Sequence, residues 1–172
     1  MDVPRLVLAL GEALRARGAR LATAESCTGG LIAAACTAVA GASDWFERGF
    51  VTYSNEAKTE MLGVDAGLID TRGAVSAEVA CAMAAGALTR SRAQIAVAVT
   101  GIAGPGGATP GKPVGTVWLA LAQRGSAAQA ELLLLSGDRA AVRDRTVQIA
   151  LQRLLDAARA SAGQVKPPST RA

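Results

Sequence analysis

The chain has 172 residues, a formal net charge of +4 at pH 7 and not one histidine. The length is typical of a single domain, and a hydrophobic fraction of 51% is typical of a globular protein. The missing histidine excludes Ser-His-Asp and Cys-His catalysis as well as zinc sites built on imidazole, so acid–base chemistry would need lysine, tyrosine, a carboxylate or water as the base.

Helical and extended patterns alternate along the first hundred residues. In chain order they predict a helix at 3–17, a strand at 20–25, a helix at 26–39 with Ser26 as N-cap, a strand at 46–54, a short helix at 55–62 capped by Asn55, a helical turn or loop at 66–71, a helix at 76–90, a strand at 94–100, a hairpin of strands 114–123 and 129–135, and a last helix from Asp138 to about 160.

This alternation predicts an α/β fold. We expect a single-domain layered α/β/α sheet that is mixed, mostly parallel and completed by a C-terminal β-hairpin, with helices flanking it. The domain is expected to span residues 1–160, and residues 161–172 are expected to be a flexible tail.

Composition also limits the partners. The basic residues are scattered and only five residues are aromatic, so nucleic-acid binding is not indicated. No apolar run approaches the roughly 20 residues of a membrane helix, and the N-terminus lacks the layout of a secretion signal. The three cysteines form no C-x-x-C pair. We therefore expect a cytoplasmic protein without nucleic-acid or membrane partners.

The first segment that could carry chemistry is AESCTGG, at residues 24–30, where a predicted strand meets a predicted helix. The N–H groups at a helix start can hold an anion or an oxyanion, and Gly29 and Gly30 would let a ligand approach the backbone. Ser26 is then a candidate nucleophile and Cys27 a rival one. Alternatively, Ser26 only caps the helix and the glycines serve packing.

The second segment is TYSNEAK, at residues 52–58, which contains Tyr53 and Lys58. A lysine near a helix start and partly buried is pushed towards its neutral form, and a neutral lysine can deprotonate a serine hydroxyl. Tyr53 could relay or position that proton. Alternatively, Lys58 is a solvated surface lysine and Tyr53 a core residue.

The third segment is a Gly/Pro loop that leaves a buried strand and contains Thr100, Gly101, Gly104, Gly106 and Gly107. Open α/β sheets bind ligands at such a place, although a plain surface loop is the alternative. Residues 106–112 match the spacing G-x-x-x-x-G-K, but Pro113 replaces the Ser or Thr that binds magnesium and a strand is predicted to follow. We reject an ATPase on these grounds.

A fourth segment, SGDR with Arg139, is followed by Arg143 and Arg145. Arg139 and Arg143 are four residues apart on one predicted helix face and could receive a phosphate or carboxylate; a solvated face is the alternative. The carboxylates are dispersed without ligand spacing, so neither a metal nor another cofactor is expected.

Taken together, AESCTGGLIA, GFVTYSNEAK, VAVTGIAGPGG…KPVGTVWLA and SGDR…VR resemble, in this order, the CinA C-terminal domain family over about residues 3–160. The resemblance implies a compact α/β fold, usually assembled as a homo-oligomer. Members include nicotinamide-nucleotide amidases, which convert nicotinamide mononucleotide to nicotinate mononucleotide and ammonia in pyridine-nucleotide salvage. Larger CinA proteins add an N-terminal pyrophosphatase domain outside these 172 residues, so that activity is not assigned.

The resemblance also implies roles for individual residues. It places the serine nucleophile on Ser26, the lysine base on Lys58 and the family's tyrosine on Tyr53. The backbone around Thr28, Gly29 and Gly30 would hold the oxyanion. The loop with Thr100, Gly101, Gly104, Gly106 and Gly107 would border the nucleotide, and Arg139 would suit its phosphate.

Two other hypotheses stay open at this point. The chain could be a catalytically silent nucleotide-binding or interaction module linked to competence or DNA-damage responses, or an amidase for another pyridine or nucleotide amide. The leading hypothesis is a metal-free serine amidohydrolase that acts on nicotinamide mononucleotide.

Overall fold

One five-stranded sheet, ordered β2-β1-β3-β4-β5, organises the computed structural model, which describes residues 1–160. The strands are β1 (Leu21–Glu25), β2 (Phe46–Val51), β3 (Ile95–Gly101), β4 (Thr116–Gln123) and β5 (Gln129–Leu134). β1 pairs in parallel with β2 and β3, whereas β4 is antiparallel to β3 and β5. Every strand except β4 therefore points the same way, which confirms the predicted mixed, mostly parallel sheet with a C-terminal hairpin.

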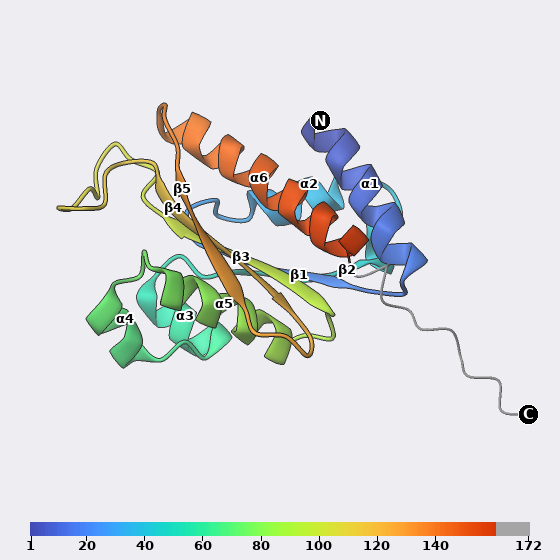
Figure 1. Cartoon of the computed structure of the whole chain (residues 1–172), viewed down its shortest axis with the longest axis horizontal. Helices are drawn as coiled ribbons and strands as arrows, with labels where there is room; N and C mark the ends of the chain where they lie inside the picture. The colour runs from blue at the N-terminus through green and yellow to red at the C-terminus, as the bar shows by residue number, and fades with distance from the viewer. Residues whose placement is uncertain (161–172) are drawn as a thin grey trace, which may run out of the picture.

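Helices cover both faces of this sheet (Figure 1). They are α1 (Val3–Ala16), α2 (Leu31–Thr37), α3 (Asn55–Leu62), α4 (Ala66–Arg72), α5 (Ala77–Thr89) and α6 (Arg139–Ala160), with a short 3₁₀ turn η1 (Ala42–Asp44). α1, α2 and α6 lie over one face, and α3, α4 and α5 lie under the other. The layered α/β/α architecture is thereby confirmed.

The core follows from the two-residue period of the strands. In β1 and β3, Leu21 and Val97 pack towards α1 and α6, whereas Ala22 and Ala98 pack towards α5. Alanines on the α5 face let that helix approach the sheet closely. Each face thus has its own apolar cluster, and the carboxyl ends of the strands are held at one edge.

Most predicted element boundaries are close to the observed ones, but two caps differ. The helix predicted at 26–39 begins only at Leu31, and Ser26 is not its N-cap. The helix predicted from Asn55 is capped by Ser54, whose side chain accepts from the N–H of Ala57. The expected tail, 161–172, lies outside the described residues. Within residues 1–160, no helix is both long and apolar enough to cross a membrane.

The crossovers create a crevice at the sheet edge. β1 connects to β2 through α2 on one face, and β2 connects to β3 through α3, α4 and α5 on the other. Chains that leave neighbouring parallel strands towards opposite faces open a gap at the carboxyl ends of those strands, where α/β sheets bind ligands. Here the chains that leave β1 and β2 diverge in this way, and the pocket described below is lined by residues that follow β1, β2 and β3.

Candidate active site

Three strand ends bring the candidate residues together. Ser26 follows β1, and its N–H donates to the carbonyl of Val99 in β3 at 3.0 Å. Thr52 follows β2, and its N–H donates to the carbonyl of Glu25 at 2.9 Å. These bonds extend the sheet by one residue on each side of β1, so the segments after β1 and β2 start side by side.

Ser26 and Lys58 form a buried pair. Lys58 is 1% exposed and Ser26 is 9% exposed, and Lys58 Nζ lies 3.1 Å from Ser26 Oγ. Lys58 Nζ also donates to the carbonyls of Thr52 at 2.9 Å and Ser54 at 3.4 Å. The Ser54 cap starts α3 directly after β2, and this start places the fourth helical residue over the crevice.

The surroundings of Lys58 shift its protonation equilibrium towards the neutral amine. Burial lowers the pKa of Lys58 below its usual value, and this effect exceeds the opposing influence of Cys27 and Glu56. None of the ion pairs found within residues 1–160 includes Lys58. In the structure Nζ donates to Ser26 Oγ as well as to the two carbonyls; without one proton, the amine has two N–H groups for the carbonyls and a lone pair for the Ser26 hydroxyl.

A buried carboxylate shapes the turn that carries Ser26. Glu25 is fully buried and accepts from the Thr28 hydroxyl at 2.7 Å and from the N–H groups of Gly30, Ile32 and Ala33 at 3.0, 3.0 and 2.8 Å. The expected helix start at Ser26 is wrong because Gly29 and Gly30, with φ of 61° and 98°, make a turn before α2. Sequence reasoning missed Glu25, although a lone acid in an apolar strand was a usable signal.

The Thr28 hydroxyl and the N–H groups of Gly29 and Gly30, residues predicted to hold the oxyanion, are engaged within the turn that carries Ser26. The Thr28 hydroxyl and the Gly30 N–H donate to Glu25, and the Gly29 N–H donates to the Ser26 carbonyl at 3.0 Å. These donors hold the turn together. None of the three residues lines the pocket beside Ser26.

That pocket has a volume of about 230 Å³. It brings together six of the predicted site residues: Ser26, Tyr53, Lys58, Thr100, Gly101 and Arg139. It adds five that sequence reasoning did not assign to the site: Cys27 as a lining residue, Asn55, Ala74, Val75 and Ala103. Gly104, Gly106 and Gly107 are not among its lining residues. The Thr100 hydroxyl donates to the Ala74 carbonyl at 2.8 Å, which ties β3 to the segment before α5.

Tyr53 and Arg139 meet at this pocket. Tyr53 is 60% exposed, and its hydroxyl accepts from Arg139 Nη2 at 2.8 Å. Arg139 Nη1 donates to the Gly104 carbonyl at 2.9 Å. The other arginines of the segment point elsewhere: Arg143 donates to the Thr28 carbonyl at 3.0 Å and Arg145 to Gln148 at 2.9 Å.

Cys27 is a poor rival nucleophile. Burial raises the pKa of its thiol to about 11, so it is protonated at neutral pH.

The loop with the spacing G-x-x-x-x-G-K does not form a phosphate-binding loop. The Nζ of its Lys112 donates to the carbonyls of Val75 at 2.7 Å and Arg72 at 3.3 Å, and strand β4 follows the loop. Within the described part of the chain, no group of three or more acidic or cysteine side chains is arranged to hold a metal ion.

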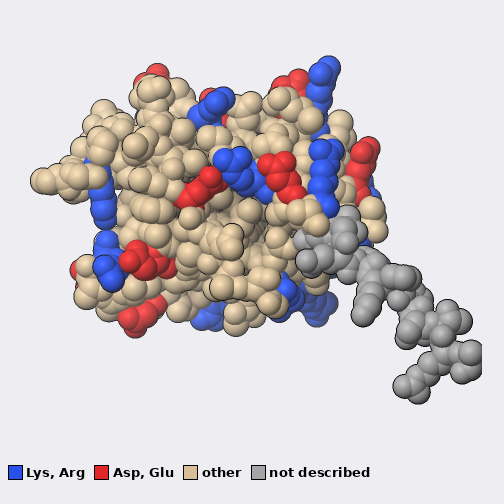
Figure 2. Space-filling view, viewed as in Figure 1, with Lys and Arg blue, Asp and Glu red and all other residues tan. Residues whose placement is uncertain are grey.

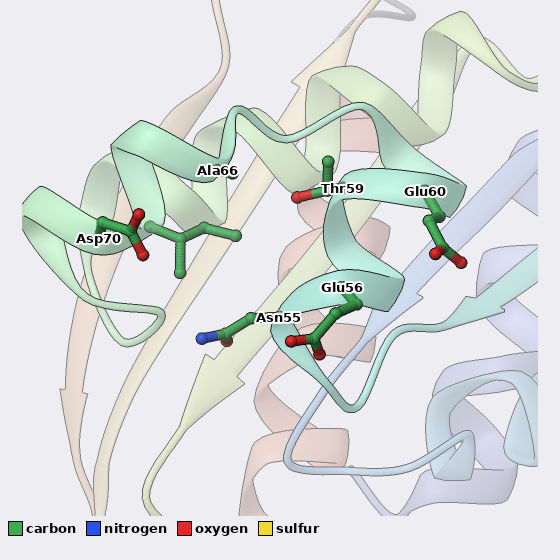
Figure 3. A pocket seen from close by; sticks show the side chains of 7 residues that line it. Asn55, Glu56, Thr59, Glu60, Ala66 and Asp70 are labelled. Atoms are coloured by element: carbon green, nitrogen blue, oxygen red, sulfur yellow. The ribbon is translucent and has the colours of Figure 1, made fainter.

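A second pocket, of about 320 Å³, lies beside α3 and α4 (Figure 3). Its lining includes Glu56, Glu60 and Asp70, and Asn55 lines both pockets. It lacks Ser26 and Lys58, so the smaller pocket is the candidate active site.

The molecular face in Figure 2 carries acidic and basic side chains interspersed with one another rather than one basic stripe.

Known proteins are similar to this chain in sequence and in fold. The model of the CinA C-terminal domain matches residues 4–158. The chain is 59% identical over 140 residues to a CinA-like protein of Akkermansia muciniphila, which covers 81% of this chain but only 34% of that protein. It is 53% identical over 145 residues to the nicotinamide-nucleotide amidohydrolase PncC of Escherichia coli, which covers 84% of this chain and 88% of that protein.

A solved structure agrees with these relatives. The crystal structure of the competence/damage inducible protein CihA from Agrobacterium tumefaciens matches with a TM-score of 0.88 and 47% identity, over 91% of this chain and 95% of that one. The family match spans nearly all of the described residues, and the structural match covers 91% of this chain. The chain therefore belongs to the CinA C-terminal domain family.

Proposed function

We propose that this chain is an amidohydrolase that converts nicotinamide mononucleotide to nicotinate mononucleotide and ammonia. The observation that carries the proposal is the buried contact of 3.1 Å between Lys58 Nζ and Ser26 Oγ. The 53% identity to a nicotinamide-nucleotide amidohydrolase over most of both chains supports the choice of substrate. The longer CinA-like relative, of which this chain spans about a third, supports no further activity.

The chemistry is acyl transfer through Ser26. Neutral Lys58 takes the hydroxyl proton while Ser26 Oγ bonds to the carboxamide carbon, whose oxygen becomes an oxyanion. The Lys58 ammonium then gives that proton to the departing nitrogen, the C–N bond breaks, and ammonia leaves an ester on Ser26. Water attacks this ester with Lys58 again as base, which releases nicotinate mononucleotide and restores the serine.

The N–H of Cys27 is the donor that we assign to the oxyanion. Cys27 follows the nucleophile and lines the pocket, as does the donor residue after the serine of other hydrolases. Thr28, Gly29 and Gly30 support the site indirectly, because their donors fix the Ser26 turn. Thr100 and Gly101 border the nucleotide, and the loop with Gly104, Gly106 and Gly107 reaches its phosphate beside Arg139.

The test is the release of ammonia from nicotinamide mononucleotide by the purified protein and by Ser26→Ala. Turnover by the native chain that is lost in Ser26→Ala supports both the substrate and the nucleophile. Unchanged turnover in Ser26→Ala would refute the mechanism. Ligand-induced thermal stabilisation without any product would instead favour a silent nucleotide-binding module linked to competence or DNA damage.

Substrate range, location and assembly complete the proposal. Comparing turnover of other pyridine or nucleotide amides tests whether the mononucleotide is preferred.

We propose a cytoplasmic homo-oligomer. Leu132 and Leu134 on the edge strand β5 are 46% and 70% exposed, and these apolar side chains support the assembly. Light scattering coupled to size-exclusion chromatography would contradict it if the native mass were that of one chain.

A further inference from the structure

Arg139 connects three segments at the mouth of the candidate active site. It is the first residue of α6, and its guanidinium donates to the Tyr53 hydroxyl after β2 and to the Gly104 carbonyl after β3. Arg139 and Tyr53 both line the pocket that contains Ser26 and Lys58. Movement or loss of the Arg139 guanidinium therefore removes a hydrogen bond from the Tyr53 hydroxyl.

The two acceptors of Arg139 are both neutral. Arg139 is exposed, and none of the ion pairs within residues 1–160 includes it. A phosphate dianion is a much stronger acceptor than a phenol or a peptide carbonyl, and the guanidinium fork matches its geometry. A phosphate that reaches the pocket mouth thus competes for the N–H group that now holds Tyr53.

The backbone of Tyr53 is fixed, whereas its side chain is free to turn. Thr52 is held through its N–H by Glu25 and through its carbonyl by Lys58, and Ser54 caps α3. The Tyr53 side chain between them is 60% exposed, and the hydrogen bond to Arg139 is the one that its hydroxyl makes among the described residues. Its release requires only side-chain rotation, on a nanosecond timescale or faster.

We infer that Arg139 is a phosphate-operated latch on Tyr53. The phosphate of the substrate takes the guanidinium away from the Tyr53 hydroxyl, and the released side chain turns into the pocket towards Ser26 and Lys58. The inference rests on the proposed amidohydrolase function and deepens it: the phosphate activates the site as well as anchoring the substrate. Arg139 is a substrate-binding residue that also positions Tyr53.

Tyr53 is the single tyrosine of the chain, so one spectroscopic signal reports on it. With 3-fluorotyrosine incorporated, we expect saturable movement of the ¹⁹F resonance on titration with inorganic phosphate and no movement with chloride at equal ionic strength. In Arg139→Ala the resonance should no longer respond to phosphate, whereas Arg145→Ala, on the same helix, should respond like the parent. A resonance that stays still in the parent, or that moves equally in Arg139→Ala, overturns the latch.

Kinetics separate a latch from simple anchoring. With nicotinamide riboside, which lacks the phosphate, inorganic phosphate should raise kcat at least about tenfold in the parent, within the range of a positioned proton-transfer group. The stimulation should vanish in Arg139→Ala and in Tyr53→Phe. Arg139→Ala should also raise KM for the mononucleotide about 10- to 100-fold, the range for a lost charge-assisted hydrogen bond.

The outcomes also separate the latch from the proposed function. Two results overturn the latch: stimulation of kcat by phosphate that persists in Tyr53→Phe, or a kcat for the riboside that does not change with phosphate. Ammonia formation from the mononucleotide would still support the proposed function. Absence of ammonia from every substrate refutes the function, and the ¹⁹F titration then still decides whether phosphate moves Tyr53.

Discussion

Replacing Lys58 by methionine is the sharpest test of the site, because methionine keeps the length of the buried stem and removes the amine. Lys58 is 1% exposed and contacts Ser26 Oγ at 3.1 Å. We expect Lys58→Met to lower kcat for ammonia release by about 10²–10⁴-fold, the usual contribution of a positioned general base. The measurement is the initial rate of ammonia release at saturating nicotinamide mononucleotide.

The structure argues for the upper end of that range. The other polar groups that line the pocket cannot replace the amine: the pKa of the Cys27 thiol is raised to about 11, a guanidinium such as that of Arg139 has no lone pair to accept a proton, and a phenol hydroxyl such as that of Tyr53 is a far weaker proton acceptor than an amine. No histidine exists to rescue the proton transfer. Water is the base that remains.

A control variant separates loss of the base from loss of a lysine that binds main-chain carbonyls. Lys112 also donates from Nζ to two main-chain carbonyls, but it does not line the pocket. Lys112→Met should therefore keep most of the turnover. If Lys58→Met is folded and retains turnover within about threefold of the parent, the reasoning from burial and distance is refuted.

The stability of Lys58→Met supplies a second readout. The native pKa of Lys58 lies below its usual 10.5, so between these two values the unfolded chain binds more protons than the native one. Native stability then rises with pH through this window. Lys58→Met lacks this increase, so denaturant titrations should show the parent gaining stability relative to the variant as the pH approaches 10.5. A constant difference would contradict the lowered pKa.

Three further predictions address the surroundings of the pair. Glu25→Ala leaves four donors without their acceptor and should lower the free energy of unfolding by about 3 kcal/mol or more in denaturant titrations, whereas the exposed Glu60→Ala should change it little. Glu56→Gln removes a charge that raises the pKa of Lys58, so the acidic limb of the kcat profile should move to lower pH, and a limb that moves to higher pH would contradict this account. Gly86→Ala places a methyl group against the Leu62 carbonyl oxygen and should cost about 1–3 kcal/mol of stability; a melting temperature equal to that of the parent would show that α3 and α5 can move apart freely.

The sequence pattern predicted the fold, and the resemblance to the CinA C-terminal domain family implied that Ser26 and Lys58 meet. Alternating helix and strand patterns favour a mostly parallel sheet, and the observed strand order then explains the meeting, because residues that follow neighbouring parallel strands lie at one edge. The start of α2 was not predictable from caps, because a serine before two glycines suits both a helix cap and a turn. The Glu25 carboxylate determines where α2 starts, because it accepts hydrogen bonds from four donors, the last of which belongs to Ala33.

The contact between Tyr53 and Arg139 was also beyond sequence reasoning. It joins positions 86 residues apart, one after β2 and one at the start of α6. Arginine spacing on the last helix suggested that Arg139 and Arg143 act together, but helix geometry fixes only that they share a side. Their partners differ because the loop after β3 reaches Arg139, whereas the turn before α2 reaches Arg143.

Glu25 and Lys58 are the charged side chains buried within residues 1–160, and they form no ion pair with each other. That separation is a requirement of a base without histidine. A carboxylate beside Lys58 would stabilise the ammonium and remove the lone pair that Ser26 needs. Glu25 is instead occupied by the turn and the first N–H groups of α2, which also closes that helix start to a substrate anion. Of the groups proposed for the substrate phosphate, the guanidinium of Arg139 is the one that lines the pocket.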